Sequence, residues 1–312
     1  MIMVESISYQ GVKTYRKILL VIIIILLSIP LFHPNNNVVA QVEENLEGIE
    51  VRVYNGGIDP KNVASETALF HMFQWMNANV DWINAQEILN GELKNVNLLA
   101  MPAISPYTIN DESVAAGGDL YEVRTMIQEF ITNGGAYFGI YGGSYFEWSG
   151  YPLFDVRLTF PNPNVSSAEY IAEININRVS GIPNISNKND TISMLTWNPG
   201  YFNSFGETKI IVIATYPENG LPAMVCFNHG SGRVFISSPH PEHEENSERD
   251  GTTFYEYLDD PDSEWGLLLT ISNWLVDKTD VIIFWSTVGI FGSTFILGLG
   301  YYMLKQKKAR KN

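Results

Sequence analysis

The sequence has one cysteine among 312 residues, Cys226, so the chain cannot form an intrachain disulfide. Cys226 lies within an apolar run over residues 223–227, where a free cysteine is usually a small buried hydrophobe rather than a reactive thiol. We therefore expect the fold to depend on its hydrophobic core. The roughly 240 residues between the two chain ends are enough for one large domain.

Basic residues are also scarce. The chain has 19 Lys and Arg against 34 Asp and Glu, a net charge of −15. Residues 41–280 alone hold 33 acidic and 11 basic residues, a net of −22. A surface this acidic disfavours nucleic acid and anionic lipid headgroups, so we predict no nucleic-acid partner.

Long apolar runs occur at the two ends of the chain. Residues 18–32 follow Lys13, Arg16 and Lys17 and are too few to span a bilayer, which takes about 20 residues. A basic start, an apolar middle and small residues before residue 41 are typical of a secretory signal, so residues 1–40 are predicted to be a signal peptide. An uncleaved N-terminal anchor is the alternative.

The second apolar run, residues 281–304, has no charged residue and is long enough to cross a membrane. The basic tail 305–312 follows it and is predicted to be cytoplasmic by the positive-inside rule. Together the two ends predict a single-pass protein of the cell membrane, with residues 41–280 outside the cytoplasm. Three glycosylation sequons in that part suggest an exposed, Asn-rich loop region; they begin at Asn164, Asn184 and Asn189.

The exported part has the pattern of an α/β domain. Apolar or alternating runs predict strands, and segments with helical spacing lie between them. A β-rich stretch follows residue 150 and shows no clear helix. These features predict a flavodoxin-like, doubly wound and mostly parallel sheet with an antiparallel β extension. The predicted strands are 49–54, 80–83, 96–101, 136–140, 209–215, 223–227 and 233–237, and the predicted helices are 64–76, 120–131 and 264–276.

Two short motifs carry the chemistry. The first is Gly139-Ile140-Tyr141-Gly142-Gly143-Ser144, which follows a predicted strand as a nucleophile elbow does. Glycines flank such a turn because the following helix packs close to it. The second is Pro239-His240-Pro241-Glu242. In an extended segment residues i and i+2 point the same way, so Glu242 is placed to orient the His240 imidazole.

Together these motifs resemble the class I glutamine amidotransferase-like superfamily, in which a Gly-x-Cys-x-Gly elbow and a distant His-Pro-Glu form a Cys-His-Glu triad. The order of four motifs is most similar to the N-terminal domain of biotin–protein ligase-like proteins, over roughly residues 49–275. The four segments in this chain are 53–56 (Val-Tyr-Asn-Gly), 101–104 (Met-Pro-Ala-Ile), 139–143 (Gly-Ile-Tyr-Gly-Gly) and 239–242 (Pro-His-Pro-Glu).

The sequence departs from that family at two positions. Tyr141 stands where the resemblance places the nucleophilic cysteine, and Ala103-Ile104 replaces a Gly-Gly that supplies the oxyanion amide. Both departures affect acyl transfer. The resemblance therefore implies a triad of Tyr141, His240 and Glu242 that lacks Cys-dependent catalysis, beside a cleft formed by the elbow and by Ala103 and Ile104.

The leading hypothesis is thus a membrane-anchored pseudoenzyme that binds a small ligand, a peptide or a partner protein and needs no cofactor or metal. An active hydrolase is the alternative, with His240 and Glu242 acting on water, Ser144 or a metal. Ser144 is favoured as a structural residue because the Gly-x-Ser-x-Gly pattern is broken. Residues 240–250 are rich in His and carboxylates but match no metal-ligand spacing, so we expect a solvated acidic loop there, as at residues 256–262.

Overall fold

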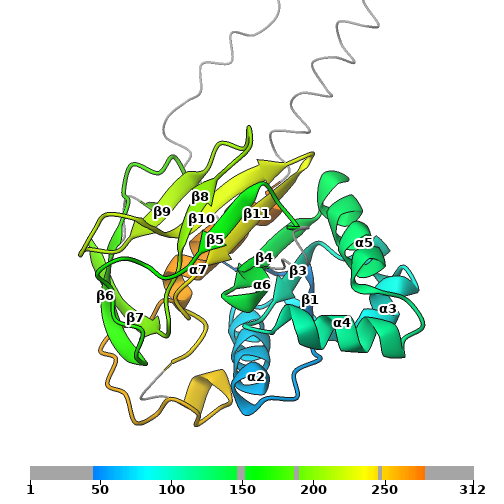
Figure 1. The fold of residues 1–312 in the computed structure, drawn as a ribbon, viewed down its shortest axis with the longest axis horizontal. Coiled ribbons are helices and arrows are strands. Elements are labelled where there is room, and N and C mark those ends of the chain that lie inside the picture. Colours follow the sequence, from blue (N-terminus) through cyan, green and yellow to red (C-terminus); the bar gives the residue numbers. More distant parts are fainter. Residues whose placement is uncertain (1–44, 146–151, 186–189, 245–247, 278–312) are drawn as a thin grey trace, which may run out of the picture. The chain divides into compact units, whose positions relative to one another are not determined.

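The computed structural model describes residues 45–145, 152–185, 190–244 and 248–277. Within them a nine-stranded sheet has the order β2-β1-β3-β4-β11-β10-β9-β6-β7, and β5 and β8 form a separate pair (Figure 1). The strands are β1 (Glu50–Tyr54), β2 (Asn79–Ile83), β3 (Leu98–Met101), β4 (Ala136–Ile140), β5 (Val156–Thr159), β6 (Tyr170–Ile176), β7 (Thr191–Thr196), β8 (Tyr201–Ser204), β9 (Ile211–Thr215), β10 (Pro222–His229) and β11 (Gly232–Ser237).

Strands β2, β1, β3, β4 and β11 pair in parallel. Counted along the chain their order is 2-1-3-4-5, that of a flavodoxin-like doubly wound sheet, as predicted. In the register of β4 and β11, Ile140 lies beside Ser237, so the carboxyl ends of the two motif-bearing strands are adjacent. Ligand sites of such sheets lie at the carboxyl ends of the strands, and both motifs start there.

Beyond β11 the sheet becomes antiparallel. Neighbouring strands pair antiparallel in the order β11, β10, β9, β6 and β7. The predicted antiparallel extension is therefore confirmed, and it makes up about half of the sheet. An isolated bridge between Leu195 and His240 joins the end of β7 to the His-Pro-Glu segment. The extension therefore reaches back to the carboxyl edge of the parallel strands.

Helices cover both faces of the parallel strands. Leu98 and Ala100 of β3 face the core under α2 and α7, whereas Leu99 and Met101 face the core under α3, α4 and α5. Strands buried on both faces are almost wholly apolar, which explains the runs seen in the sequence. The helices are α2 (Pro60–Trp75), α3 (Ala85–Leu89), α4 (Pro106–Ala115), α5 (Leu120–Thr132), α6 (Gly142–Tyr145) and α7 (Trp265–Val276), with short 3₁₀ turns η1 (Glu92–Asn95) and η3 (Glu248–Asp250).

Local signals set the helix starts near the site. Asp59 caps α2 by accepting from the amide of Lys61, and Pro60 occupies the first turn, where no intrahelical N–H is needed. Asp119 and Glu122 form a capping box at the start of α5.

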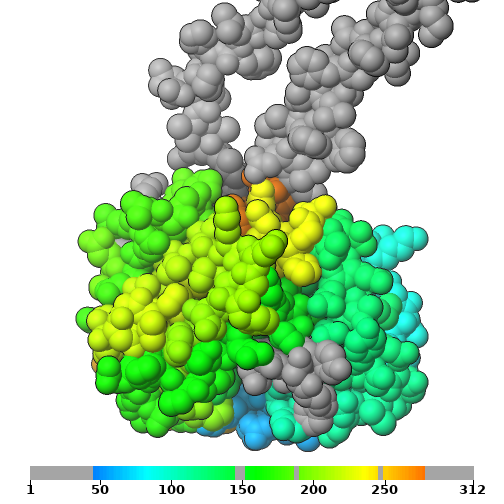
Figure 2. Space-filling model, turned by 45° about the horizontal axis from the view of Figure 1, so that its top comes forward, coloured from blue at the N-terminus to red at the C-terminus, as the bar shows by residue number. Residues whose placement is uncertain are grey.

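Figure 2 shows the surface of α3 to α5 (cyan to teal) next to that of the antiparallel strands (green to yellow-green).

Several predictions concern residues that the structure does not describe, namely the signal peptide, the membrane span 281–304, the basic tail and Asn189. Within the described ranges, no helix has the length and apolar character to cross a membrane. Asn164 and Asn184 are exposed and both adopt positive φ, 66° and 67°, as turn asparagines do. Both asparagines are therefore exposed, as predicted.

Candidate functional site

Tyr141 occupies a strained turn between β4 and α6. Its φ is +41°, in the left-handed region that a bulky residue rarely adopts, and its amide donates to the Ser237 carbonyl at 2.8 Å. This hydrogen bond ties the turn to the end of β11. A strained residue at the carboxyl end of a central strand is the geometry of a nucleophile elbow.

The glycines after Tyr141 allow a close approach of two backbones. A Cβ on Gly142 would overlap with the Ile104 carbonyl, and one on Gly143 would overlap with the Met101 carbonyl. The Gly143 amide donates to the Pro102 carbonyl at 3.0 Å, which holds the elbow against the loop after β3. The loop that carries Ala103 and Ile104 and the elbow 139–144, predicted to line one cleft, are therefore in direct contact.

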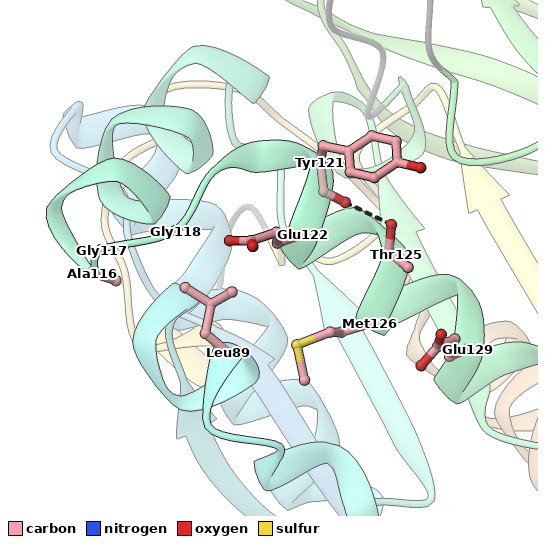
Figure 3. Close-up of a pocket in the computed structure, with 9 residues that line it drawn as sticks. All are labelled: Leu89, Ala116, Gly117, Gly118, Tyr121, Glu122, Thr125, Met126 and Glu129. Carbon is pink, nitrogen blue, oxygen red and sulfur yellow. Dashed lines mark hydrogen bonds between the residues drawn. The ribbon is translucent and has the colours of Figure 1, made fainter.

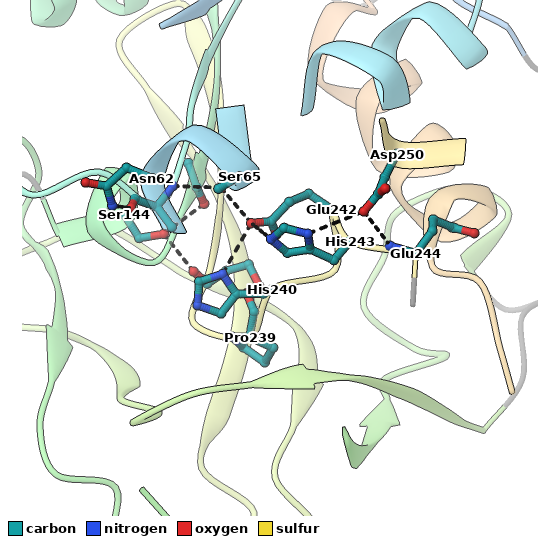
Figure 4. A network of polar contacts seen from close by, with 12 residues as sticks. Asn62, Ser65, Ser144, Pro239, His240, Glu242, His243, Glu244 and Asp250 are labelled. Carbon is teal, nitrogen blue, oxygen red and sulfur yellow. Dashed lines mark hydrogen bonds and ion pairs between the residues drawn. The ribbon is translucent and has the colours of Figure 1, made fainter. Parts of the chain in front are cut away.

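His240 and Glu242 are brought together as the spacing predicted. The His240 Nδ1 lies 3.2 Å from Glu242 Oε1, and the two side chains are 3% and 0% exposed. The ring of His240 lies 5.2 Å from that of Tyr141, so the three positions implied by the resemblance are neighbours. In Figure 4, Ser65, His240 and His243 gather around the Glu242 carboxylate.

Glu242 is a buried carboxylate kept in its charged form. Burial alone would raise its pKa, but the nearby His240 and His243 and the Ser65 hydroxyl together lower the pKa below its ordinary value. Ser65, on α2, donates to Glu242 Oε1 at 2.7 Å. The Trp265 indole N–H of α7 donates to the Glu242 carbonyl at 3.0 Å. Two helices thus fix this residue at the edge of the sheet.

The loop that an acyl-transfer enzyme would use for oxyanion binding has its amides engaged internally. The Ala103 amide donates to Ser65 Oγ at 3.0 Å, and the Ile104 amide donates to the Pro102 carbonyl at 2.7 Å. An oxyanion hole requires N–H groups directed at the reacting oxygen. Neither of these two amides is directed into a cleft.

Tyr141 forms part of an aromatic wall. Its ring stacks on Trp197 at 5.7 Å and meets Phe160 edge-on at 5.8 Å, while Asn198 donates to its hydroxyl at 3.4 Å. Burial raises the pKa of the Tyr141 phenol, which keeps it protonated. A cavity of about 250 Å³ opens beside this wall. Its lining includes Asn62, Ala103, Ile104, Tyr141, Phe160 and Trp197.

The two other candidate nucleophiles have structural positions. The Ser144 hydroxyl is buried and lies 2.8 Å from the carbonyls of both Gly139 and Ser237, so it links β4 to β11. Cys226 is fully buried on β10, and burial raises the pKa of its thiol well above its usual range. Both positions agree with the structural roles predicted for them.

The expected solvated acidic loop is wrong for most of the residues that the structure describes there. His243, Glu244 and Asp250 are all at least nine-tenths buried. Asp250 Oδ2 lies 3.4 Å from His243 Nδ1 and also accepts from the Glu244 amide, while Arg249 pairs with Glu244. The segment is buried because it packs between α2 and α7, which its polar composition did not indicate.

A larger hollow, of about 480 Å³, lies away from both motifs between α3, the end of α4 and α5 (Figure 3). Leu89, Tyr121, Glu122 and Met126 contribute to it. Glu122 already accepts from the Asp119 amide in the capping box. The smaller cavity beside Tyr141 is the stronger candidate because it adjoins the strained elbow and the His240–Glu242 pair.

Sequence reasoning missed Ser65 and Trp197. Ser65 contacts a residue 177 positions away, and Trp197 comes from the β-rich stretch where no motif was found. A serine on the buried face of a predicted helix is a detectable signal, because a buried hydroxyl needs a partner. Trp197 had no comparable signal.

No family model and no curated protein matches the chain. Solved structures, in contrast, match the chain. A ThuA-like protein of Bacteroides uniformis aligns over 75% of this chain and 93% of its own, with a TM-score of 0.50 and 13% identity. A glutamine amidotransferase of Thermotoga maritima aligns over 73% and 98%, with a TM-score of 0.50 and 14% identity. Identities this low establish the architecture alone: the chain shares the fold of these two proteins.

Proposed function

We propose that this protein is a ligand-binding module built on an amidotransferase-like fold and without Cys-dependent catalysis. One observation carries the proposal. The nucleophile position holds Tyr141, whose ring forms one wall of a cavity of about 250 Å³ instead of presenting a reactive group. The engaged amides of Ala103 and Ile104 support the loss of acyl-transfer chemistry.

The cavity fits a small molecule. Its volume lies below the roughly 300–1,000 Å³ of drug-sized sites, and three aromatic rings line it. Such rings bind a flat apolar face, while the Asn62 side chain, whose amide nitrogen donates to the Ala103 carbonyl, offers its oxygen for a polar contact. The Lys61 ammonium lies 3.8 Å over the Trp197 ring and pairs with Glu169, so a cation already occupies one face of that indole. A neutral ligand with one flat face suits this site best.

Ligand-observed NMR with a metabolite panel tests the proposal on the full chain. We expect hits whose affinity falls about tenfold or more in Trp197→Ala, because a lost aromatic stack costs on the order of 1.4 kcal/mol. Tyr121→Ala, in the larger hollow, is the matched control and should leave the affinity unchanged. Binding that responds to Tyr121→Ala but not to Trp197→Ala would move the site to the other hollow. Amidase turnover abolished by His240→Ala would refute the non-catalytic role.

We further propose that residues 41–280 are an extracytoplasmic domain anchored by the span 281–304, and that the domain is most similar to biotin–protein ligase N-terminal-domain-like proteins. The basic tail and the acidic net charge of the domain support the orientation. Protease added to intact cells should digest residues 41–280 and spare a small membrane-bound fragment. Protection of the domain would overturn this orientation.

A further inference from the structure

The segment His240-Pro241-Glu242-His243 buries three side chains of types that bind metals. Glu242 Oε1 lies 3.2 Å from His240 Nδ1 and 3.7 Å from His243 Nε2, and one ligand atom from each residue lies within 4.8 Å of the others. Each of the three side chains is 3% exposed or less. The cavity beside Tyr141 does not use them, because His243 and Glu242 are not among its lining residues.

A second carboxylate borders the cluster. Glu242 is fully buried and Asp250, which contacts His243, is 2% exposed. Two buried carboxylates therefore lie beside two buried imidazoles. Imidazole nitrogens and carboxylate oxygens are the side-chain groups that bind a divalent transition-metal ion.

A second, independent feature points to a ligand. Among the described residues, the buried Glu242 Oε2 and His240 Nε2 have no hydrogen-bond partner. Leaving a buried polar atom unsatisfied costs about 1–3 kcal/mol, and more for a charged group. Glu242 Oε2 belongs to the carboxylate whose Oε1 contacts both imidazoles, so a metal ion bound by both oxygens of that carboxylate would satisfy it.

The spacing is close to that of a bound ion. Ligand atoms that share a tetrahedral zinc at about 2.1 Å lie about 3.4 Å apart. The separations of 3.2 and 3.7 Å already match, and the widest gap would have to close by at most about 1.4 Å. Asp250 Oδ2, 3.4 Å from His243 Nδ1, stands where the carboxylate partner of a metal-binding histidine stands. Ser65 holds the Glu242 carboxylate in the same way.

We propose that His240, Glu242 and His243 bind one divalent transition-metal ion of the zinc class. Two imidazoles and a carboxylate suit Zn²⁺ better than Ca²⁺ or Mg²⁺, which prefer oxygen ligands. Because Ser65 of α2 and Trp265 of α7 both donate hydrogen bonds to Glu242, the ion would help to fix the segment after β11 against these two helices. Three protein ligands leave one position for a solvent molecule.

The test measures metal in the untagged full chain. After loading with Zn²⁺ and dialysis against metal-free buffer at pH 7, we expect one equivalent by elemental analysis. His243→Gln should lose it, whereas His229→Gln, which removes a histidine of β10 outside the cluster, should retain it. Asp250→Asn keeps all three ligands and should weaken binding about 10–100-fold, as loss of a residue that orients a ligand does.

Substitution with Co²⁺ gives a readout that does not need the variants to fold. The wild-type chain should show the intense visible absorption of four-coordinate cobalt. A weak octahedral spectrum, no stoichiometric metal in the wild-type chain, or full retention in His243→Gln would each overturn the proposal. Ligand binding beside Tyr141 is measured separately, so either proposal can fail without the other.

Discussion

Replacing Ser65 with Ala should be among the most destabilising single changes in this domain. Ser65 is 1% exposed, donates to Glu242 Oε1 at 2.7 Å and accepts from the Ala103 amide at 3.0 Å. Ser65→Ala removes a hydrogen bond to a charged group, worth about 1.5–3 kcal/mol, and leaves a buried amide unsatisfied, which costs about 1–3 kcal/mol. The two contributions come from one side chain and do not simply add, so we expect Ser65→Ala to lower the free energy of unfolding by roughly 3 kcal/mol.

The assay is thermal or urea unfolding followed by circular dichroism. For a domain of this size 1 kcal/mol shifts Tm by about 2–4 °C, so Ser65→Ala should lower Tm by roughly 6–12 °C. Ser113→Ala is the matched control. Ser113 is also a fully buried helical serine, but its hydroxyl donates only to the Ile109 carbonyl of its own helix at 2.6 Å. The Ile109 carbonyl keeps its backbone hydrogen bond within the helix, so Ser113→Ala should lower the free energy of unfolding by less than about 1 kcal/mol.

The effect of Ser65→Ala should depend on pH with a defined sign. The pKa of Glu242 lies below its ordinary value because His240, His243 and Ser65 outweigh the effect of burial. A lowered carboxyl pKa stabilises the fold above the unfolded value of about 4.3, and this stabilisation is lost as the pH falls through the folded pKa. The difference in the free energy of unfolding between Ser65→Ala and wild type should therefore be largest near pH 7 and become smaller below about pH 4. Equal destabilisation by both serine variants, at every pH, would refute the reasoning.

Two further predictions follow from buried titratable groups. Burial, aided by the charges of nearby carboxylates, raises the pKa of Asp260 from 3.8 to about 6. A carboxyl group whose pKa is raised in the folded state destabilises the fold at pH values above that pKa. Asp260→Asn should therefore raise the free energy of unfolding by up to about 3 kcal/mol above pH 6 and leave it unchanged below about pH 4. Stabilisation by Asp260→Asn at acid pH would contradict this prediction. Tyr141→Cys should place a thiol beside the His240 imidazole, so iodoacetamide should modify it faster than the buried Cys226, and equal rates would count against the preserved triad geometry.

Much of the fold could be predicted from the sequence because strands buried on both faces are nearly all apolar. Residues 96–101 and 136–140 show this directly, and they became β3 and β4. Helix α4 was not predicted. Only three of its residues are buried, Pro106, Ile109 and Ser113, so the segment carries almost no helical apolar pattern. Tertiary contacts and the cap at Ser105 define it instead.

The candidate site was predictable only where its residues are close in sequence. The pairing of His240 with Glu242 follows from their spacing and from Pro241, because both constraints are local. The partnership of Ser65 with Glu242 joins α2 to the segment after β11 and leaves no local pattern. The burial of residues 240–244 was missed for the same reason, since composition alone makes a segment rich in His and Glu look solvated.

The two halves of the triad differ in how freely they can change. Tyr141 borders a cavity and is half-buried, so a different side chain there alters the lining without leaving a charged group unpaired. His240 and Glu242 are buried and contact each other, and Glu242 also accepts from Ser65, so loss of His240 or of Glu242 leaves the other residue buried without its partner, at a cost of several kcal/mol. A substitution of Tyr141 is therefore expected to cost less stability than a substitution of His240 or Glu242. The burial and pairing of His240 and Glu242 give the His-Pro-Glu segment a role in stabilising the core that does not depend on catalysis.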